Sequence, residues 1–366
     1  MKKILIFAPT APTSGITQYI LNILNTAALD GLEIDILSFK NDRLKKWAEE
    51  KGRKYYEFNI SMYKHPIKYR RFLNEVFSSG YNVVHYHLSS LSTLNIFKIA
   101  RKSGVKKIIL HSHSTFTDLP SKMRTVVFST IHKLLRKRAT GFADVLCACS
   151  KPAAEWMFGS HKAQEAFILN NAVDTDKFAY NKDVGCDIKA QLGIKEKYVI
   201  GHIGRFSKQK NQHFLIEIME EVLKLRDDCA LVLVGDGADR EYVQEFSKEK
   251  RLDNKIWFVD FKEDIYKYYS SFDLFVLSSL FEGLPITLVE AQANGLHSLV
   301  SDNITKESNL TGLVEFLPLE EGSAFWAQKL CKALDSSKRI ETKMLLKEKG
   351  FDLAEQSEKL LRLYRG

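Results

Sequence analysis

Arg205 and Lys210 stand five residues apart, directly after an apolar run that ends at Gly204. Two cations at the end of a buried strand are unfavourable unless they face solvent or an anion. A diphosphate suits this pair, because arginine binds oxygens in a fork and lysine acts as a point charge. We therefore expect an anion site here, with a solvated basic loop as the alternative.

A second candidate anion site lies in the segment from Ser278 to Ala291, where Gly283 and Pro285 precede an apolar helix. Pro285 suits the first turn of that helix. The N–H groups of Leu284 and Ile286 are then free at its N-terminus, where the partial positive charge of the helix favours an anion.

The same segment holds two glutamates, Glu282 and Glu290, and eight residues separate them. Glu290 falls within an apolar helix, where a buried carboxylate needs a partner. A sugar diol such as a ribose supplies two hydroxyl donors to such a carboxylate. The spacing of the glutamates carries little information by itself; the succession of strand, Glu-Gly-x-Pro and helix makes the signal specific.

Histidines end two of the apolar runs, His85 and His87 in the first and His111 and His113 in the second. A histidine at the end of a strand hydrogen-bonds a ligand hydroxyl or moves a proton. Metal binding is the rival hypothesis. Two histidines two residues apart share a face of a strand, but the sequence shows no third ligand. Purely structural histidines remain an alternative.

Gly15 follows the first apolar run and precedes a helix that begins near Thr17. A glycine at this place lets backbone N–H groups approach an anion at the helix N-terminus. The loop lacks the GxGxxG fingerprint of dinucleotide-binding proteins. A tight turn from strand to helix is the alternative.

Short apolar runs rich in β-branched residues alternate with segments of helical spacing, such as Phe214–Leu225. Continuously apolar strands are typical of parallel sheets covered by helices on both faces, and their ligands bind at the carboxyl ends of the strands. The pattern occurs twice, so we expect an α/β protein with two doubly wound, Rossmann-like domains. The predicted strands are Ile4–Ala8, Ile34–Phe39, Val83–His87, Lys107–His111, Val145–Cys149, Ala166–Asn170, Tyr198–Ile203, Ala230–Val234, Ile256–Val259, Leu274–Leu277, Ser298–Ser301 and Val314–Leu317.

The length of 366 residues also indicates two domains, because single cores stop growing near ~250–300 residues. The polar stretch Asp174–Leu192 is the expected boundary region. We predict a first domain over residues 1–173, a second over 174–350, and a terminal segment over 351–366. Its helix, Leu353–Tyr364, could pack on either domain.

The composition, 45% hydrophobic and 27% charged, excludes disordered, collagen-like and membrane-spanning chains. The first residues predict a strand instead of a signal peptide. Five scattered cysteines without a CxxC pair argue against disulfides and a zinc site, and favour a cytoplasmic location.

Charge is distributed unequally along the chain, whose net charge is +9. Residues 1–180 contain 27 Lys and Arg against 14 Asp and Glu, whereas residues 181–366 contain 27 against 31. The first half thus carries +13 and the second −4. A basic half favours an anionic partner: nucleic acid, anionic lipid or a phosphorylated acceptor.

Residues 121–138 hold six Lys and Arg and no acidic residue. On a helical wheel, one side collects apolar residues and the opposite side collects cations. Such a helix can lie on an anionic bilayer. A crossover helix that packs its apolar side on the sheet is the alternative. The apolar side holds Met123, Val127, Ile131, Leu134 and Leu135 together with Arg124 and Arg138, and the basic side holds Lys122, Lys133, Arg136 and Lys137.

These motifs resemble those of the retaining glycosyltransferases of family four, which have the GT-B fold. The resemblance rests on Gly204-Arg205…Lys210, Gly235-Asp236-Gly237 and Glu282-Gly283-Leu284-Pro285…Glu290-Ala291, together with His113 and Asn171-Ala172-Val173-Asp174 with Phe178. It spans nearly the whole chain. The segments GRFSKQKN, EAQANGL and SDNITKE resemble, more narrowly, the capsular and exopolysaccharide transferases of bacteria.

The resemblance implies a nucleotide-sugar donor in a cleft between the domains. Arg205 and Lys210 would hold its diphosphate, with Gly15 and Gly204 close by, and Glu290 would bind its ribose. Glu282 and His113 would contact the donor sugar. The backbone around Gly283, Leu284, Pro285 and Ile286 would bind phosphate and sugar, and residues 258–262 would face the base. Catalysis would need no metal or other cofactor.

The sequence departs from the family pattern at four places: Ser14, Ala172, Asn211 and Asp260 stand where glycine is common. No charged motif residue is lost, so we expect an active enzyme. The departure at Ser14 leaves the detail of its loop open, and that at Asp260 leaves the preferred base open.

We therefore expect a cytoplasmic enzyme at the inner face of the plasma membrane. It would transfer a hexose or N-acetylhexosamine from a UDP-sugar to a lipid-linked glycan during capsule or exopolysaccharide synthesis. A nucleotide-sugar 2-epimerase or a phosphorylase of the same fold is one alternative, and a basic nucleic-acid-binding protein is another. The sequence lacks a motif for nucleic acid, so none is expected as a partner.

Overall fold

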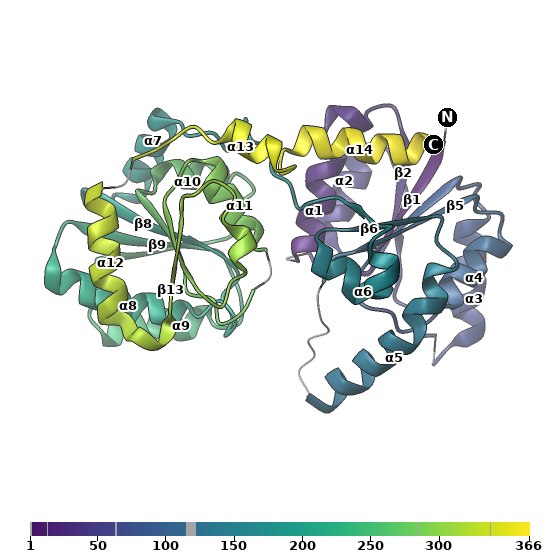
Figure 1. Cartoon of the computed structure of the whole chain (residues 1–366), viewed down its shortest axis with the longest axis horizontal. Helices are drawn as coiled ribbons and strands as arrows, with labels where there is room; N and C mark the ends of the chain where they lie inside the picture. Colours follow the sequence, from purple (N-terminus) through teal and green to yellow (C-terminus); the bar gives the residue numbers. More distant parts are fainter. Residues whose placement is uncertain (1, 13, 63, 115–121, 283, 337) are drawn as a thin grey trace. The chain divides into compact units, whose positions relative to one another are not determined.

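The computed structural model describes residues 2–12, 14–62, 64–114, 122–282, 284–336 and 338–366. The chain forms two compact units (Figure 1). Unit 1 comprises Met1–Ala172 and Leu353–Gly366, and unit 2 comprises Val173–Asp352. The first crossing falls one residue before the predicted boundary at 173/174, and the return crossing falls two residues after the one predicted at 350/351.

The polar stretch Asp174–Leu192 does not separate the units, contrary to our expectation. It contains helix α7 (Lys182–Leu192), which belongs to unit 2. Gly185 of α7 lies so close to the carbonyl oxygen of Ser270 that a Cβ atom there would be 2.2 Å from it. The polar residues therefore reflect the exposed side of a packed helix.

Unit 1 is built on a seven-stranded sheet with the order β3-β2-β1-β4-β5-β6-β7. Every pairing in it is parallel. Its strands are β1 (Lys3–Ala8), β2 (Glu33–Ser38), β3 (Tyr55–Glu57), β4 (Val83–Leu88), β5 (Lys107–Ser112), β6 (Val145–Ala148) and β7 (Phe167–Ile168). Its helices are α1 (Gly15–Leu24), η1 (Ala27–Leu29), α2 (Asp42–Glu50), α3 (Pro66–Phe77), α4 (Asn95–Lys102), α5 (Lys122–Thr140), α6 (Lys151–Ala163) and α14 (Leu353–Arg365).

Unit 2 has a six-stranded parallel sheet with the order β10-β9-β8-β11-β12-β13. This is the doubly wound, Rossmann-like order, which reverses between β8 and β11. Its strands are β8 (Tyr198–Ile203), β9 (Cys229–Val234), β10 (Ile256–Val259), β11 (Leu274–Leu277), β12 (Ser298–Ser301) and β13 (Val314–Leu317). Besides α7, its helices are α8 (Gln212–Leu225), α9 (Arg240–Glu249), α10 (Tyr266–Ser271), α11 (Ile286–Ala293), η2 (Lys306–Ser308), η3 (Leu319–Glu321), α12 (Gly322–Ser336) and α13 (Lys343–Glu348).

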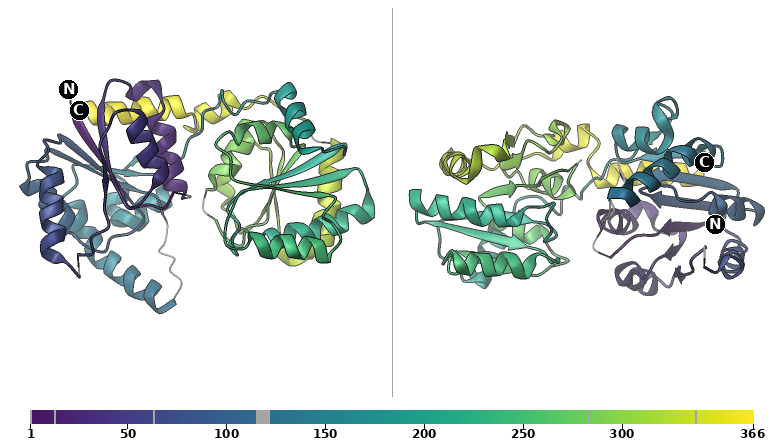
Figure 2. Two further views of the ribbon diagram at one scale, coloured as in Figure 1. Left: turned by 180° about the vertical axis from the view of Figure 1, so that it is seen from behind. Right: turned by 90° about the horizontal axis from the view of Figure 1, so that it is seen from below.

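Helices cover both faces of each sheet (Figure 2), and each unit therefore has two apolar clusters, one on either side. All six residues of β9 are buried, as the continuous apolar run predicts. The two doubly wound α/β domains and all twelve predicted strands are confirmed. The missed strand, β3, is a three-residue edge strand without a fully buried residue, so it carries little apolar signal.

The last helix, α14, packs on unit 1 alongside α1 and η1, where Leu360, Leu361 and Tyr364 join the core (Figure 1). The strand-like pairing of Val173 with Asp352 brings the two crossings of the chain next to each other. Tyr364 is thereby carried back to β4, more than 270 residues earlier in the chain.

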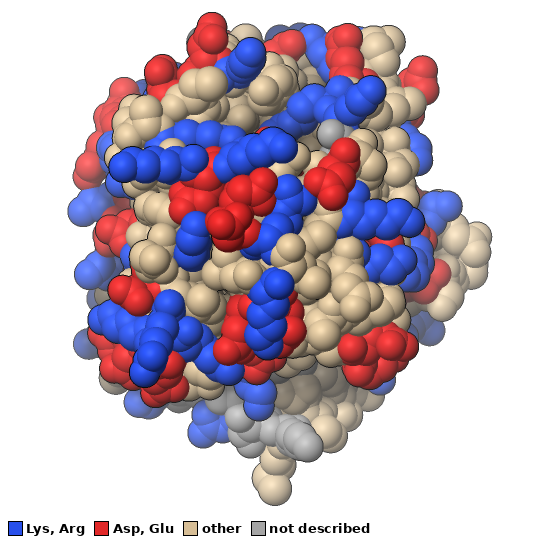
Figure 3. Space-filling model, turned by 90° about the vertical axis from the view of Figure 1, so that its left-hand side faces the viewer, with Lys and Arg blue, Asp and Glu red and all other residues tan. Residues whose placement is uncertain are grey.

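The unequal charge of the two halves is sharper when it is counted by unit. Unit 1 has 29 Lys and Arg against 14 Asp and Glu, a net +15, while unit 2 has 25 against 31, a net −6. The face of unit 2 in Figure 3 accordingly mixes both signs. Among the described residues, no helix has the length and hydropathy needed to cross a membrane.

Candidate functional site

The strands β8 and β11 are neighbours in unit 2, so the loops after them meet at the carboxyl edge of the sheet. There Lys210, after β8, forms an ion pair with Glu282, after β11. Ser279 donates a hydrogen bond of 2.7 Å to the same carboxylate oxygen. The side chains of Lys210 and Glu282 are only 16% and 9% exposed. The structure thus brings together two predicted site residues that are 72 positions apart in the sequence.

Backbone hydrogen bonds tie these two loops to each other. The N–H of Leu280 donates to the carbonyl of Gln209 at 2.8 Å, and the side chain of Gln209 donates to the carbonyl of Phe281 at 3.0 Å. Asn211 has a left-handed backbone, with φ 57°, and its amide donates to the carbonyl of Ser278 at 3.1 Å. Asparagine tolerates this conformation, and its side chain adds a link that the glycine common at this position could not make.

Arg205 lies exposed at the same edge. Gln212 holds the backbone of this loop by donating to the carbonyl of Arg205 at 2.9 Å. Gly235, at φ 146°, lies against the neighbouring turn, where a Cβ atom would be 2.1 Å from the carbonyl oxygen of Gly204. Among the described residues, no acidic side chain pairs with Arg205, so its guanidinium is available to an anion.

Glu290 is 1% exposed, in the middle of α11. Burial raises its pKa to about 7, although the hydroxyl of Tyr269 donates to its carboxylate at 2.7 Å and opposes that shift. Within the described part of the chain, Tyr269 is the one hydrogen-bond donor found for this carboxylate. A diol would supply the additional donors that favour its charged form.

The N-terminus of α11 opens at this edge. Pro285 occupies the cap position and Ile286 is the first helical residue, so the prediction of Pro285 in the first turn is wrong by one position. The hydroxyl of Thr287 is buried and has no hydrogen-bond partner among the described residues. A polar ligand at the helix N-terminus would satisfy it. Leu284 directly precedes this cap, whereas Gly283 lies outside the described residues.

The residues expected near the base, 258–262, begin within the last two positions of β10 and continue into the loop after it. Asp260, which stands in place of the common glycine, forms an ion pair of 2.5 Å with Arg240. Arg240 also donates to the carbonyl of Gly235 at 3.0 Å. The substitution therefore fixes an arginine across the ends of β9 and β10.

In unit 1, Gly15 is the first residue of α1, and the side chain of Ser14 caps this helix by accepting from the N–H of Thr17. A Cβ atom at Gly15 would have no neighbour within 4 Å. The structure therefore leaves room for a side chain at this position, and the role of Gly15 beside an anion stays a prediction.

Unit 1 also brings four histidines together, which we call the histidine cluster: His85, His87, His111 and His113. His87 lies opposite His111 in the register of β4 and β5. One ring nitrogen from each of His85, His87 and His111 lies within 4.8 Å of the other two. The sequence shows no third ligand for either pair, but the parallel pairing of β4 and β5 supplies one by placing the two His-x-His segments side by side.

The histidine cluster is neutral. Burial lowers the pKa of His85 and of His113 to about 3, and lowers the pKa of His87 and His111 well below the usual value. His87 Nδ1 and His113 Nε2 are 2.8 Å apart and share a hydrogen bond. His113, which is predicted to contact the donor sugar, is thus oriented by His87. The sequence alone did not link these two residues.

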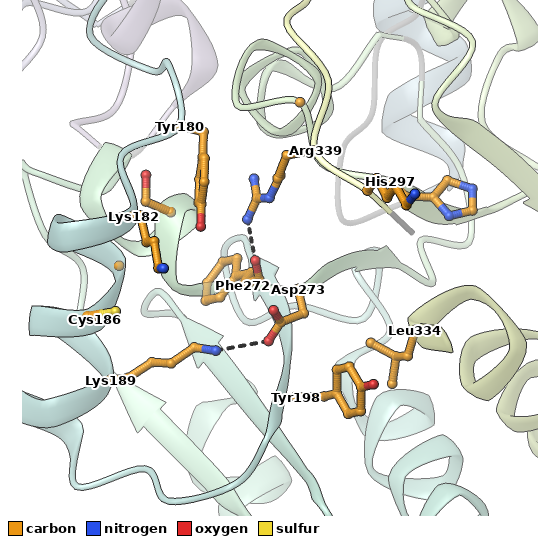
Figure 4. Close-up of a pocket in the computed structure, with 14 residues that line it drawn as sticks. Tyr180, Lys182, Cys186, Lys189, Tyr198, Phe272, Asp273, His297, Leu334 and Arg339 are labelled. Atoms are coloured by element: carbon orange, nitrogen blue, oxygen red, sulfur yellow. Dashed lines mark hydrogen bonds and ion pairs between the residues drawn. The ribbon is translucent and has the colours of Figure 1, made fainter. Parts of the chain in front are cut away.

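Two further cavities differ in chemistry. A cavity of about 650 Å³ in unit 1 is lined by Phe7, Phe39 and Phe58 and by the serine-rich loop Ser89–Thr93. A cavity of about 260 Å³ in unit 2 includes Lys189 and Arg339 (Figure 4). These two cations are engaged by Asp273 and by the carbonyl of Phe272, respectively. The two cations of the unit 2 cavity are thus already engaged by protein groups, and the cavity is separate from the candidate anion site.

Sequence inspection missed Tyr269, Tyr19 and Tyr364. Tyr269 lies 21 residues from Glu290, and Tyr364 lies 279 residues from His85. Each contact depends on tertiary packing. No local pattern marks these residues.

Two family models match the chain. Residues 13–177 match Glycosyltransferase Family 4, and residues 187–308 match Glycosyl transferases group 1. EpsF of Bacillus subtilis (strain 168), which carries a provisional glycosyltransferase designation, is 30% identical over 96% of this chain and 93% of its own length. A UDP-Gal:alpha-D-GlcNAc-diphosphoundecaprenol alpha-1,3-galactosyltransferase of Escherichia coli is 28% identical over 61% of this chain and 58% of its own.

Solved structures share the fold. The glycosyltransferase from Rickettsia africae ESF-5 has a TM-score of 0.74 and 17% identity, covering 100% of this chain and 98% of its own. Anabaena HepE, solved in complex with UDP and glucose, has a TM-score of 0.70 and 17% identity, covering 100% and 95%. The pair of Rossmann-like units is thus a GT-B fold.

Proposed function

The chain belongs to the glycosyltransferases that carry a family 4 domain and a group 1 domain, and on this premise we propose its donor, acceptor and stereochemistry. It transfers a hexose or N-acetylhexosamine from a UDP-sugar to a lipid-linked oligosaccharide during capsule or exopolysaccharide synthesis, with retention at the anomeric carbon. The observation that carries the proposal is the Lys210–Glu282 pair beside Arg205 and the N-terminus of α11.

The diphosphate develops negative charge as the sugar leaves it. Lys210, whose ammonium has three N–H donors, binds a phosphate oxygen while it stays paired with Glu282, and Arg205 binds a second phosphate oxygen. The free N–H groups at the start of α11 stabilise the same charge. These protein groups take the place of a metal ion, so neither brief EDTA treatment nor added manganese should change the rate. Glu290 holds the ribose hydroxyls.

Glu282 is poorly suited to act as a covalent nucleophile. Its carboxylate is already engaged by Lys210 and by Ser279 at 2.7 Å. An engaged carboxylate positions a sugar hydroxyl better than it attacks carbon. We accordingly favour attack by the acceptor from the side of the leaving group, with Glu282 and His113 as contacts of the donor sugar.

Unit 1 supplies the acceptor side of the proposal. Its 650 Å³ cavity combines aromatic rings with serine hydroxyls, which suits an amphiphilic glycan acceptor. The net +15 of this unit attracts a lipid diphosphate and an anionic bilayer.

Helix α5 provides a surface for the bilayer. Met123 and Leu134 are 78% and 72% exposed, and Val127 is also exposed. The first turns of α5 project beyond the other helices of unit 1 in Figure 1 and in the left view of Figure 2. The alternative in which this apolar side packs on the sheet is therefore wrong for these three residues. On the side that packs, His132 and Ala139 are buried, and Leu135 of the predicted apolar side packs against the same core as Ala139.

The prediction that Arg136 belongs to the solvated or lipid-facing basic side of α5 is wrong. Arg136 donates to the carbonyls of Glu155 and Trp156 in α6, each at 3.3 Å, so it braces two helices. Lys133, Lys137 and Arg138 remain exposed. These three cations are the proposed contacts with anionic lipid head groups, which place the enzyme at the inner face of the plasma membrane. The side chain of Lys122 lies outside the described residues.

A donor screen tests the proposal. The purified protein is incubated with UDP-, GDP- and ADP-sugars, with and without a polyprenyl-diphosphate-linked sugar acceptor. We expect release of UDP from one UDP-sugar, and transfer of its sugar with the anomeric configuration of the donor. Transfer from a GDP- or ADP-sugar would contradict the donor class, and inversion in the product would contradict the mechanism. Appearance of a free 2-epimer would indicate an epimerase instead.

A further inference from the structure

The histidine cluster contains polar atoms that the interior of unit 1 leaves unsatisfied. Nε2 of His87 and Nε2 of His111 are buried without a partner among the described residues, and so is the hydroxyl of Tyr19. The Tyr19 ring lies 5.3 Å from that of His111 and 5.1 Å from that of His113, centroid to centroid. A buried polar atom without a partner is unfavourable, so a ligand that pairs with these atoms would stabilise unit 1.

The hydrogen bonds of the cluster can leave two ring nitrogens without a proton. If His87 donates its Nδ1–H to Nε2 of His113, the Nε2 atom of His87 is a bare lone pair. Likewise, Nδ1 of His85 is 2.8 Å from the hydroxyl of Tyr364, so donation to that oxygen leaves Nε2 of His85 without a proton. Metal-binding histidines are held in this way, with one nitrogen on the ion and the other N–H on an outer partner.

We propose that His85, His87 and His111 form a site for a transition-metal ion, with Tyr364 and His113 as its outer partners. The ligand nitrogens lie within 4.8 Å of one another. Three nitrogens that each lie about 2.1 Å from one ion in tetrahedral geometry are about 3.4 Å apart. Closure on an ion would therefore shorten the longest of these separations by up to about 1.4 Å, and it would replace the 3.2 Å contact between Nε2 of His85 and Nδ1 of His111.

The chemistry of the ligands selects the class of metal. Neutral imidazoles bind Zn²⁺, Co²⁺, Ni²⁺ or copper, whereas Mg²⁺ and Ca²⁺ require oxygen ligands. Tyr19, whose ring lies 5.3 Å from that of His111, offers its phenol as a candidate fourth ligand, and the proton that it would lose to solvent on binding would offset part of the ion's charge.

This site would stabilise unit 1 and would fix His113 through its bond to His87. Its ligands come from two strands, and its outer partner Tyr364 comes from α14. Metal binding would therefore fasten the last helix to the sheet. The proposal stands independently of the sugar donor, because none of its ligands belongs to unit 2.

Metal binding is tested on the full chain without a polyhistidine tag. Elemental analysis of the purified protein and titration of the chelator-treated protein with Co²⁺, followed by visible absorption, should both give one ion per chain. Mg²⁺ should give no signal. Zn²⁺ should displace Co²⁺ and raise the unfolding temperature, because it binds the folded state more tightly than the unfolded state.

Three variants make the test specific. His111→Gln removes a ligand and should weaken Co²⁺ binding by more than about 100-fold, since even the loss of an outer partner costs about 10- to 100-fold. Tyr364→Phe, which removes an outer partner, should fall in that lower range. His161→Gln changes an exposed histidine and should have no effect. Circular dichroism checks that each variant is folded.

The contrary results are equally definite. Wild-type protein that retains and titrates no metal, or His111→Gln protein that binds Co²⁺ as tightly as wild type, would overturn the proposal and leave buried water as the occupant. If His111→Gln does not fold, the comparison of Tyr364→Phe with His161→Gln decides, because equal affinities of those two variants would overturn it as well.

Discussion

The sheets of the two units reverse their strand order at equivalent places, between β1 and β4 in unit 1 and between β8 and β11 in unit 2. Beside the reversal in unit 2 lie charged groups: Lys210, Glu282 and Arg205. In unit 1 the carboxyl ends of β4 and β5 carry neutral imidazoles instead. The topology fixes where ligands can bind. Burial and charge then decide which chemistry each edge supports.

The difference extends to the surfaces. Unit 1 carries +15 and leaves apolar residues of α5 exposed, whereas unit 2 carries −6 with both signs intermixed (Figure 3). One unit is thus suited to large anionic and amphiphilic partners, and the other to one compact anion held by a few specific groups. Four experiments test this difference between the units, in order of decreasing expected effect.

The largest expected effect is on turnover. Lys210→Ala should lower kcat by about 10²–10³, because it removes a cation that stabilises the charge developing on the leaving diphosphate. Lys208→Ala, which changes an exposed lysine in the same loop, should leave kcat unchanged. Equal effects of the two substitutions in a UDP-release assay would reduce the Lys210 site to a solvated basic loop.

The next effect concerns the membrane. Replacing Lys133, Lys137 and Arg138 by alanine should weaken binding to phosphatidylglycerol vesicles by about 100-fold, because each cation near an anionic surface contributes about 1 kcal/mol. Sedimentation with vesicles measures this, and neutral vesicles should bind neither protein. Lys224, Lys248 and Lys332 of unit 2, replaced together, serve as the control. A similar loss in that control would show that net charge matters and that α5 does not.

A smaller effect is expected for the nucleotide. Glu290→Gln should weaken UDP binding by about 2 kcal/mol, roughly 30-fold, because the amide replaces an ionised acceptor of the ribose hydroxyls. Calorimetry with UDP measures the loss. Calorimetry with inorganic diphosphate is the control, and its affinity should be unchanged. An equal loss for both ligands would mean that Glu290 shapes the phosphate site instead of the ribose site.

The smallest effect is a pH dependence of stability. The pKa of Glu290 is raised to about 7 in the folded protein, from 4.5 as its ordinary value. Between these values the folded state binds a proton that the unfolded state does not, so this contribution to stability is lost as the pH rises toward 7. Thermal unfolding from pH 5 to 8 should show wild type losing stability relative to Glu290→Gln. Parallel curves would contradict the shift.

Much of the fold could be predicted, because buried parallel strands appear in the sequence as continuous apolar runs. Two elements were not predicted. The edge strand β3 lacks that signal, and α7 resembles a linker because one side of it faces solvent. Of the candidate site, Arg205, Lys210, Glu282 and Glu290 were found because charged residues beside apolar runs need a partner. That partner was not visible in the sequence.

The class of fold, the positions of nearly all strands and the edge of each sheet that carries the candidate ligand-binding residues could be predicted from the sequence. These follow from local hydrophobicity and from the geometry common to parallel sheets. The tertiary structure alone decided that Lys210 meets Glu282, that Tyr269 meets Glu290, and that two His-x-His segments and the distant Tyr364 converge. Side-chain contacts of this kind depend on strand register and helix packing, which arise only when the whole unit folds.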